Sequence, residues 1–316
     1  MPSSPPPSLT PTQLSLYLTH LFPTSPSTPH PTPPLSSHPP STQHTYLTTL
    51  LTHHLATIPF ENLSLHYSPH RQISLHRDAL FQKIVGDGKG RGGYCMENNA
   101  LFGLLLKGLG FVVYEAGARV WNPSAEGEGE GSSHMINIVT IGTKKYHVDV
   151  GFGSQGPIVP MPLDTSSPIQ PHLTPASARL QYKNIPGTTD PSQRYWVYEH
   201  RASPNTSFQP RYCFTELEFL PSDYQVMNYF TSTSNKTWFT RTVVVERKVM
   251  GEGGELVGDV TVNGDVMKRR GKDGVKEREV KFASEEERVR ALEEEFGIRL
   301  DEVERDGIKG LPSEIK

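Results

Sequence analysis

The chain has 316 residues, of which 31 are Lys or Arg and 34 are Asp or Glu, so its net charge is -3 and its isoelectric point lies near 6.5. This balance gives no electrostatic reason to expect a nucleic acid or an anionic membrane as a partner. Two cysteines, Cys95 and Cys213, are too few for a disulfide framework. No signal-peptide pattern opens the sequence, and no apolar run is long enough to span a bilayer. We therefore expect a cytoplasmic protein whose thiols stay reduced.

The N-terminal segment, residues 1–41, is dense in Pro, Ser and Thr. Residues 1–10 form a polar tail, and residues 11–22 predict a short helix with Leu14 and Leu18 on one face. Residues 23–41 carry too little apolar surface to order themselves, which is typical of a low-complexity insert. We expect one short helix followed by a mobile insert.

Residues 42–110 are predicted to be helical, with residues 45–55 and 96–109 as the strongest elements. Gly92 and Gly93 precede the second helix, and glycine can adopt backbone angles that are closed to other residues. Cys95 then falls in the first helical turn, where unpaired N–H groups and the positive end of the helix dipole stabilise a thiolate. A buried structural cysteine is the alternative.

Residues 111–240 are dominated by strand patterns, and one predicted hairpin carries a histidine and an aspartate. Its strands are the runs 134–141 and 145–150, joined by a short segment around Gly142. With a two-residue turn, His134 and Asp149 become diagonal neighbours on one face of the hairpin. A three-residue turn would separate them.

A cysteine at a helix start, a histidine and an aspartate supply what nucleophilic catalysis by a thiol requires. The imidazole of His134 takes the proton of Cys95, and the carboxylate of Asp149 fixes the imidazole tautomer. His147 lies on the same face of the hairpin and is a rival base. We predict a Cys-His-Asp triad, with His134 preferred as the base.

The glycines before Cys95 also match the pattern G-x-G-x-x-G, from Gly88 to Gly93. A dinucleotide site needs a buried strand before such a turn. Residues 78–85 instead space their apolar side chains as a helix does, so the pattern carries little weight here. No Cys or His spacing typical of zinc occurs, and we expect no bound metal.

Residues 241–316 combine strand patterns with a clearly delimited helix. Residues 241–250 and 255–267 predict two strands separated by glycines. Ser284 and Glu287 form a capping box at the start of the helix, which runs to Phe296 and ends at Gly297.

Four blocks resemble the arylamine N-acetyltransferases in order and spacing: Ile58–Leu63, Arg91–Asn99, His134–Val139 and Val148–Gly153. Weaker matches lie at 223–239 and 296–298, so the resemblance covers residues 42–300. It implies an α+β fold with a helical domain at 42–110, a β-barrel-like domain at 111–240 and a C-terminal α/β lid at 241–316. It also makes Cys95, His134 and Asp149 the counterparts of the family's catalytic triad.

The resemblance further implies a reaction. In this family a thiolate attacks the thioester of an acyl-coenzyme A such as acetyl-CoA, and the acyl-cysteine then acylates an arylamine, hydrazine or arylhydroxylamine by a ping-pong mechanism. Phe60 and Phe152 match residues that line the acceptor pocket, with plain core packing as their alternative role. The coenzyme A contacts that the resemblance implies are Gly153, Ser154, Thr231, Ser232 and Lys236.

Three other functions stay open from the sequence. A relative that prefers malonyl-CoA needs a cation or extra donors near Cys95, and Arg91, Lys236 and Arg241 are candidates. A papain-like or transglutaminase-like hydrolase would use the same triad on amides, although the block at 148–153 disfavours it. A silent homologue that only binds a small aromatic ligand would keep an unreactive Cys95.

Overall fold

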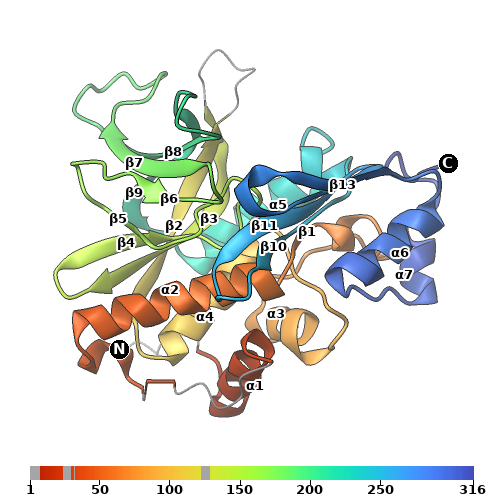
Figure 1. Ribbon diagram of the computed structural model, residues 1–316, viewed down its shortest axis with the longest axis horizontal. Helices are drawn as coiled ribbons and strands as arrows, with labels where there is room; N and C mark the ends of the chain where they lie inside the picture. The colour runs from red at the N-terminus through yellow and green to blue at the C-terminus, as the bar shows by residue number, and fades with distance from the viewer. Residues whose placement is uncertain (1–7, 24–29, 32, 122–128) are drawn as a thin grey trace.

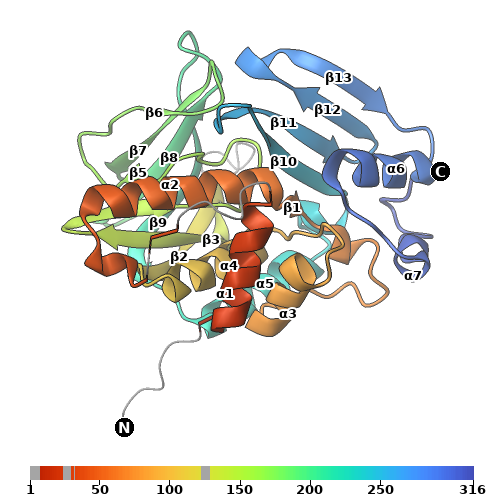
Figure 2. The same ribbon diagram turned by 60° about the horizontal axis from the view of Figure 1, so that its bottom comes forward.

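The structure of the protein is a computed structural model, which describes residues 8–23, 30–31, 33–121 and 129–316. Within this part of the chain, two antiparallel sheets lie side by side and the N-terminal helices pack beneath them (Figures 1 and 2). The expected α+β class is therefore confirmed. Among the described helices, none is both long and apolar enough to cross a bilayer.

The N-terminal part is helical and contains α1 (Pro11–Leu21), α2 (Pro40–Thr57), α3 (Arg77–Phe81) and α4 (Cys95–Gly108). The helices predicted at 11–22, 45–55 and 96–109 are confirmed. Helix α2 begins earlier than predicted because Pro40 occupies its first position, where the missing N–H and the fixed φ of proline are tolerated.

Where the structure describes it, the Pro-rich segment at 23–41 is attached to the rest of the protein at a few points, and most of its residues are exposed. Leu35 is fully buried, and its backbone N–H donates to the Leu109 carbonyl at 2.9 Å. The hydroxyl of Tyr46 lies 2.7 Å from Nδ1 of His30. This differs from the expected unordered insert, because a single leucine in an otherwise polar stretch reaches the core. Residues 24–29 and 32 of the insert, and residues 1–7 of the tail, lie outside the described residues.

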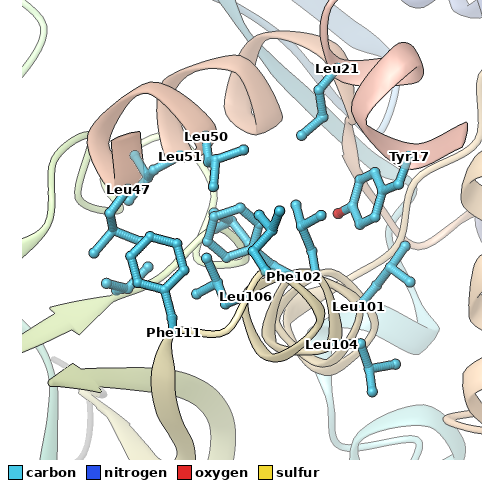
Figure 3. Close-up of a cluster of buried hydrophobic side chains, with 14 of the residues drawn as sticks. Tyr17, Leu21, Leu47, Leu50, Leu51, Leu101, Phe102, Leu104, Leu106 and Phe111 are labelled. Atoms are coloured by element: carbon cyan, nitrogen blue, oxygen red, sulfur yellow. The ribbon is translucent and has the colours of Figure 1, made fainter. Parts of the chain in front are cut away.

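The N-terminal core lies between α1, α2 and α4. Figure 3 shows Leu47 and Leu50 of α2 facing Phe102 and Leu106 of α4, and all four side chains are fully buried. Each such side chain contributes about 1.5–3 kcal/mol through its removal from water. This core fixes the helix that begins at Cys95.

The larger sheet has eight strands within the described residues: β2 (Val112–Trp121), β3 (Gly129–Ile141), β4 (Lys144–Val148), β5 (Met161–Pro162), β6 (Gln170–Pro171), β7 (Ser177–Lys183), β8 (Tyr195–Arg201) and β9 (Gln209–Glu218). Their order is β5-β4-β3-β2-β9-β8-β7-β6, and β5 also contacts β7. The sheet therefore nearly closes into a barrel, whose interior is filled by a cluster of buried apolar and aromatic side chains.

The predicted hairpin is formed by β3 and β4. Ile141 pairs with Lys144, and Asn137 pairs with Val148. The turn therefore has two residues, and Gly142 adopts a φ of 61° in it. The predicted register is confirmed, and it carries His134 and Asp149 to neighbouring positions.

The second sheet, in the order β1-β10-β11-β12-β13, contains β1 (Phe60–Glu61), β10 (Val244–Met250), β11 (Leu256–Asn263), β12 (Val266–Arg270) and β13 (Lys276–Lys281). The prediction of one strand at 255–267 is wrong. Gly264, with a φ of 61°, turns the chain so that Asn263 pairs with Val266. The prediction of strand structure up to position 240 also missed helix α5 (Pro221–Thr233).

Helix α6 (Glu285–Phe296) packs against the second sheet through a shared cluster of buried apolar side chains, and α7 (Glu302–Asp306) follows it; both lie beside that sheet, near the C-terminus (Figure 1). The Ser284 hydroxyl accepts a hydrogen bond from the Glu287 N–H, and Gly297 ends the helix with a φ of 72°, as predicted. The return half of the expected capping box is different, because the Glu287 carboxylate accepts from the Ala283 N–H instead.

Candidate active site

Close backbone packing places the cysteine at the start of α4. A Cβ atom added to Gly92 would lie 1.8 Å from the Pro59 carbonyl oxygen. Gly93 pairs with Phe60 of β1, so the loop is tied to the second sheet. Neither glycine adopts a positive φ, so the left-handed region that is open to glycine is not used at these two positions. Glycine is needed at position 92 because the Pro59 backbone lies too close for a side chain, and at position 93 because an added Cβ would lie 2.4 Å from Cβ of Glu97.

The structure brings the three predicted catalytic side chains together. Cys95 is 4% exposed, and His134 and Asp149 are 2% and 1% exposed. Nε2 of His134 lies 2.8 Å from Oδ2 of Asp149. Because a carboxylate only accepts, Nε2 carries the proton and Nδ1 is the ring nitrogen left for the thiol. The Cys95 sulfur lies 3.7 Å from the Ser133 carbonyl oxygen, beside the histidine.

The carboxylate of Asp149 is fully satisfied by four donors. Its Oδ1 accepts from Nδ2 of Asn99 and from the Gly151 N–H, and its Oδ2 accepts from His134 and from the Tyr212 hydroxyl, each at 2.8 Å. Sequence reasoning missed Asn99 and Tyr212. The spacing of four residues between Cys95 and Asn99 puts both on one helix face and was a usable signal, whereas nothing local marks Tyr212.

The charges of the pair stabilise each other. Burial alone would raise the pKa of Asp149, but the His134 imidazolium and the hydrogen bonds lower it to about 2. Burial alone would lower the pKa of His134, but the charge and hydrogen bond of Asp149, helped by Cys95, raise it to about 10. The site is therefore built to hold a positively charged imidazole beside the sulfur.

The rival base His147 lies elsewhere. It is fully buried, its ring stacks on Phe214 with centroids 5.0 Å apart, and its Nε2 lies 2.8 Å from the Tyr212 hydroxyl. Burial lowers its pKa to about 4. His147 does not line the cleft at Cys95, so the geometry favours His134.

The thiol opens into a cleft of about 1150 Å³ between the mouth of the barrel and the second sheet. Phe60, Phe152 and Phe239 line it near Cys95. The Phe60 and Phe239 ring centroids are 6.0 Å apart, and Phe152 meets the His134 ring edge to face at 5.2 Å. The arrangement provides an apolar chamber next to the sulfur.

Polar residues line the outer part of the cleft. Of the predicted coenzyme contacts, Gly153, Ser154, Thr231 and Lys236 are among the lining residues. Ser232 is not, and its hydroxyl donates to the Asn228 carbonyl within α5 at 2.7 Å.

The three candidate cations differ in position. Lys236 and Arg241 line the cleft and make no ion pair within the described residues. Arg91 does not line it, because its guanidinium binds Glu61 and Glu304, each at 3.0 Å. Arg91 therefore stabilises the loop before Cys95 and is turned away from the substrate space.

The structure does not support a dinucleotide site at the glycine pattern or a metal site among the described residues. The glycines at 88–93 follow α3 and a π-helical turn at Gln82–Gly86, whereas a dinucleotide site needs a preceding strand. In the described ranges, no three or more His, Cys, Asp or Glu side chains are grouped so as to hold a metal ion.

Comparisons with known proteins agree with this geometry. A family model described as N-acetyltransferase matches residues 45–305. The chain is 38% identical to the N-malonyltransferase FDB2 of Gibberella moniliformis over 81% of this chain and 78% of that one. It is 32% identical to arylamine N-acetyltransferase 2 of Mus musculus over 81% of this chain and 87% of that one.

Solved structures share the fold. The arylamine N-acetyltransferase of Salmonella typhimurium superposes with a TM-score of 0.75 at 25% identity, covering 93% of this chain and 94% of that one. The Mycobacterium marinum enzyme, solved in complex with CoA, has a TM-score of 0.75 at 24% identity and covers 94% and 97% of the two chains. With a family match over most of its length and this fold around its buried cysteine, the chain belongs to the arylamine N-acetyltransferase family.

Proposed function

We propose that this protein transfers an acyl group from an acyl-CoA, in the first place acetyl-CoA, to the nitrogen of an arylamine, hydrazine or arylhydroxylamine. The observation that carries the proposal is the buried contact of His134 with Asp149 beside Cys95, at the base of a cleft. Family membership supports the same reaction, and the Mycobacterium marinum relative was solved with CoA bound.

In the first half-reaction the Cys95 thiolate attacks the thioester carbonyl carbon. A tetrahedral oxyanion forms, and the N–H of Cys95, which as the first residue of α4 has no partner in its own helix, is our candidate to stabilise it. The bond to the CoA sulfur breaks, and the CoA thiolate takes the proton from the His134 imidazolium. The acyl group is then bound to Cys95 and His134 is neutral.

In the second half-reaction the acceptor nitrogen attacks the acyl-cysteine carbonyl. Neutral His134 takes the proton that the nitrogen loses, the bond to the Cys95 sulfur breaks, and the thiolate and imidazolium are restored. Asp149 stays ionised throughout and keeps the imidazole ring in one orientation.

The acceptor is proposed to bind among the aromatic residues that line the cleft near the thiol. Phe60, Phe152 and Phe239 present ring faces and edges to that space, and a flat aromatic amine stacks favourably on such rings. Donor and acceptor use the cleft in turn, because both must reach the same sulfur.

The proposal is tested by acyl loading without an acceptor. The protein is incubated with acetyl-CoA, quenched in acid and digested, and the peptide that contains Cys95 is weighed by mass spectrometry. We expect one acetyl group on Cys95, and its loss when an arylamine is added. Hydrolysis of peptide substrates without any acylated Cys95 would support the hydrolase instead, and an inert Cys95 would support the silent homologue.

A second donor is favoured by one specific observation, the identity of 38% with a protein described as an N-malonyltransferase. Malonyl-CoA carries an additional carboxylate, and Lys236 and Arg241 are cations without an ion-pair partner in the described part of the cleft. Steady-state rates with acetyl-, propionyl- and malonyl-CoA against one arylamine decide between the donors. A preference for malonyl-CoA that disappears in Lys236→Met or Arg241→Met would establish the second candidate.

A further inference from the structure

The wall of the cleft that carries Phe239 is held from behind by a buried amide. Phe239 belongs to the short 3-10 helix Trp238–Thr240, which precedes β10. Nδ2 of Asn62 donates to the carbonyls of Phe239 and Thr242, each at 2.8 Å. Its Oδ1 accepts from the Val244 N–H, also at 2.8 Å. Asn62 is fully buried, so this one side chain ties the turn to the segment that follows β1.

A histidine contacts the same carbonyl. Nε2 of His66 lies 3.0 Å from the Phe239 carbonyl oxygen, and His66 is fully buried as well. Burial lowers the pKa of His66 to about 4, so the ring is neutral near pH 7 and carries one proton. The nitrogen that carries this proton decides whether His66 holds the carbonyl or repels it.

The neighbouring groups place the proton of His66 on Nε2. Both hydrogens of the Asn62 amide, which lies 3.2 Å from Nε2, are donated to carbonyls. An unprotonated Nε2 would therefore face the Phe239 oxygen with no proton between them, which is repulsive. Nδ1 lies 2.8 Å from the Ser313 hydroxyl, which donates to it. Ser313 therefore favours the tautomer in which His66 donates to the Phe239 carbonyl.

The Phe239 ring forms part of the apolar chamber beside the thiol. Its centroid lies 6.0 Å from that of Phe60 and 5.8 Å from that of Tyr94, the residue immediately before Cys95. Cys95 itself belongs to α4, which is fixed by the N-terminal core. A shift of the backbone at Phe239 would therefore change the space for an aromatic ring and leave the sulfur in place.

We infer that His66 is a positioning residue for the acyl acceptor. By donating to the Phe239 carbonyl, with its tautomer set by Ser313, it keeps the Phe239 ring where a flat aromatic amine packs against it beside Cys95. The inference rests on the proposed function and links the C-terminal segment to the choice of acceptor. Loss of this hydrogen bond should weaken aromatic acceptors and spare hydrazine, which has no ring to pack.

Two acceptors, one with a ring and one without, test the inference. Para-toluidine is a flat aromatic amine, whereas hydrazine is a small nucleophile. In a ping-pong reaction kcat/KM for the acceptor depends only on the steps after acyl-Cys95 has formed, so both acceptors are compared on the same acyl-enzyme. In His66→Phe, which keeps a ring and removes the donor, we expect kcat/KM for para-toluidine to fall about five- to tenfold. The value for hydrazine should change by less than about twofold.

Two further variants and two controls complete the design. Ser313→Ala removes one half-buried hydroxyl, which keeps the test available if His66→Phe does not fold, and should give the same split with a loss of about two- to threefold. His66→Gln should restore the value for para-toluidine, because its amide can place an N–H where Nε2 lies. His70→Phe, an exposed histidine of the same segment, and Ser36→Ala, an exposed serine in the N-terminal part, should behave like the unmodified protein.

Two results would overturn the inference. An unchanged kcat/KM for para-toluidine in both His66→Phe and Ser313→Ala would show that Asn62 alone holds the turn. An equal loss with both acceptors would show that the substitutions disturb Cys95 instead of the Phe239 ring. Failure of the proposed function looks different, because the unmodified protein would then acquire no acetyl group from acetyl-CoA.

Discussion

The Tyr212 hydroxyl joins two buried groups that the hairpin presents on one face: it lies 2.8 Å from Oδ2 of Asp149 and 2.8 Å from Nε2 of His147. A carboxylate has no proton to give, so Tyr212 donates its single proton to Asp149. His147 must then donate from Nε2 to the Tyr212 oxygen. His147, which the sequence analysis gave as the alternative base, therefore supports the Asp149 carboxylate indirectly, through the Tyr212 hydroxyl.

The first prediction concerns this contact. Tyr212→Phe should lower kcat/KM by about 10- to 100-fold, because a hydrogen bond to a charged group contributes about 1.5–3 kcal/mol. The far-ultraviolet circular dichroism spectrum should not change, since the ring and its packing remain. A steady-state assay measures the loss, and Tyr182→Phe is the matched control. Full activity in Tyr212→Phe would mean that Asn99, Gly151 and His134 hold the carboxylate without help.

The second prediction concerns the nucleophile. Cys95→Ser should reduce acyl transfer by at least about 10³-fold, because a hydroxyl is a much weaker nucleophile than a thiolate near neutral pH. Cys213→Ser is the control, since Cys213 lies buried in β9 away from the cleft. Activity with an arylamine and acetyl-CoA is measured for both. Retained activity in Cys95→Ser would exclude the acyl-cysteine mechanism.

The third prediction concerns the pH dependence of stability. In the folded protein the pKa of His134 is raised to about 10. Its contribution to the free energy of unfolding is therefore complete below the pKa that it has in the unfolded chain, and it is lost as the pH rises towards 10. The pKa of Asp149 is lowered to about 2. Its contribution to the free energy of unfolding is therefore present above the pKa that it has in the unfolded chain, and it is lost as the pH falls towards 2. The pair therefore stabilises the fold most between about pH 4 and 6.5.

The variant Asp149→Asn, which removes the negative charge of the pair, tests this pH range. The difference in Tm between the unmodified protein and this variant should be largest near pH 5 to 6 and should shrink by pH 9 to 10, where His134 loses its proton. Thermal unfolding followed by circular dichroism gives both values at each pH. A difference that stays constant across this range would contradict an ion pair between His134 and Asp149.

Local patterns predicted the parts of the site that depend on neighbours in the chain. The alternation of strand residues placed His134 beside Asp149 on the condition that the turn at Gly142 has two residues, and the pairing of Ile141 with Lys144 meets that condition. The apolar spacing of 96–109 was enough to place Cys95 at a helix start. These features depend on periodicities that a single sequence displays.

Other parts depend on contacts between distant segments, and no local pattern encodes them. Tyr212 reaches Asp149 from β9, and Lys248 reaches the Ser154 carbonyl across the cleft. The turn at Gly264 was missed because apolar alternation continues through it on both sides. Leu35 was overlooked because composition describes a segment as a whole, whereas one buried side chain is enough to attach it to a core.

The last prediction concerns the buried charges behind the cysteine loop. Arg91 binds Glu61, which is fully buried, and Glu304 of α7, so one guanidinium joins the loop to the C-terminal helix. Arg91→Met should lower the free energy of unfolding by about 3–5 kcal/mol, because it leaves the Glu61 carboxylate without its main partner. Arg278→Met should cost no more than about 1 kcal/mol, since Arg278 is half exposed and its ion pair with Glu295 lies at the surface. Urea unfolding of both variants measures the difference, and equal values would show that Lys83 alone, 3.4 Å from Glu61, compensates the carboxylate.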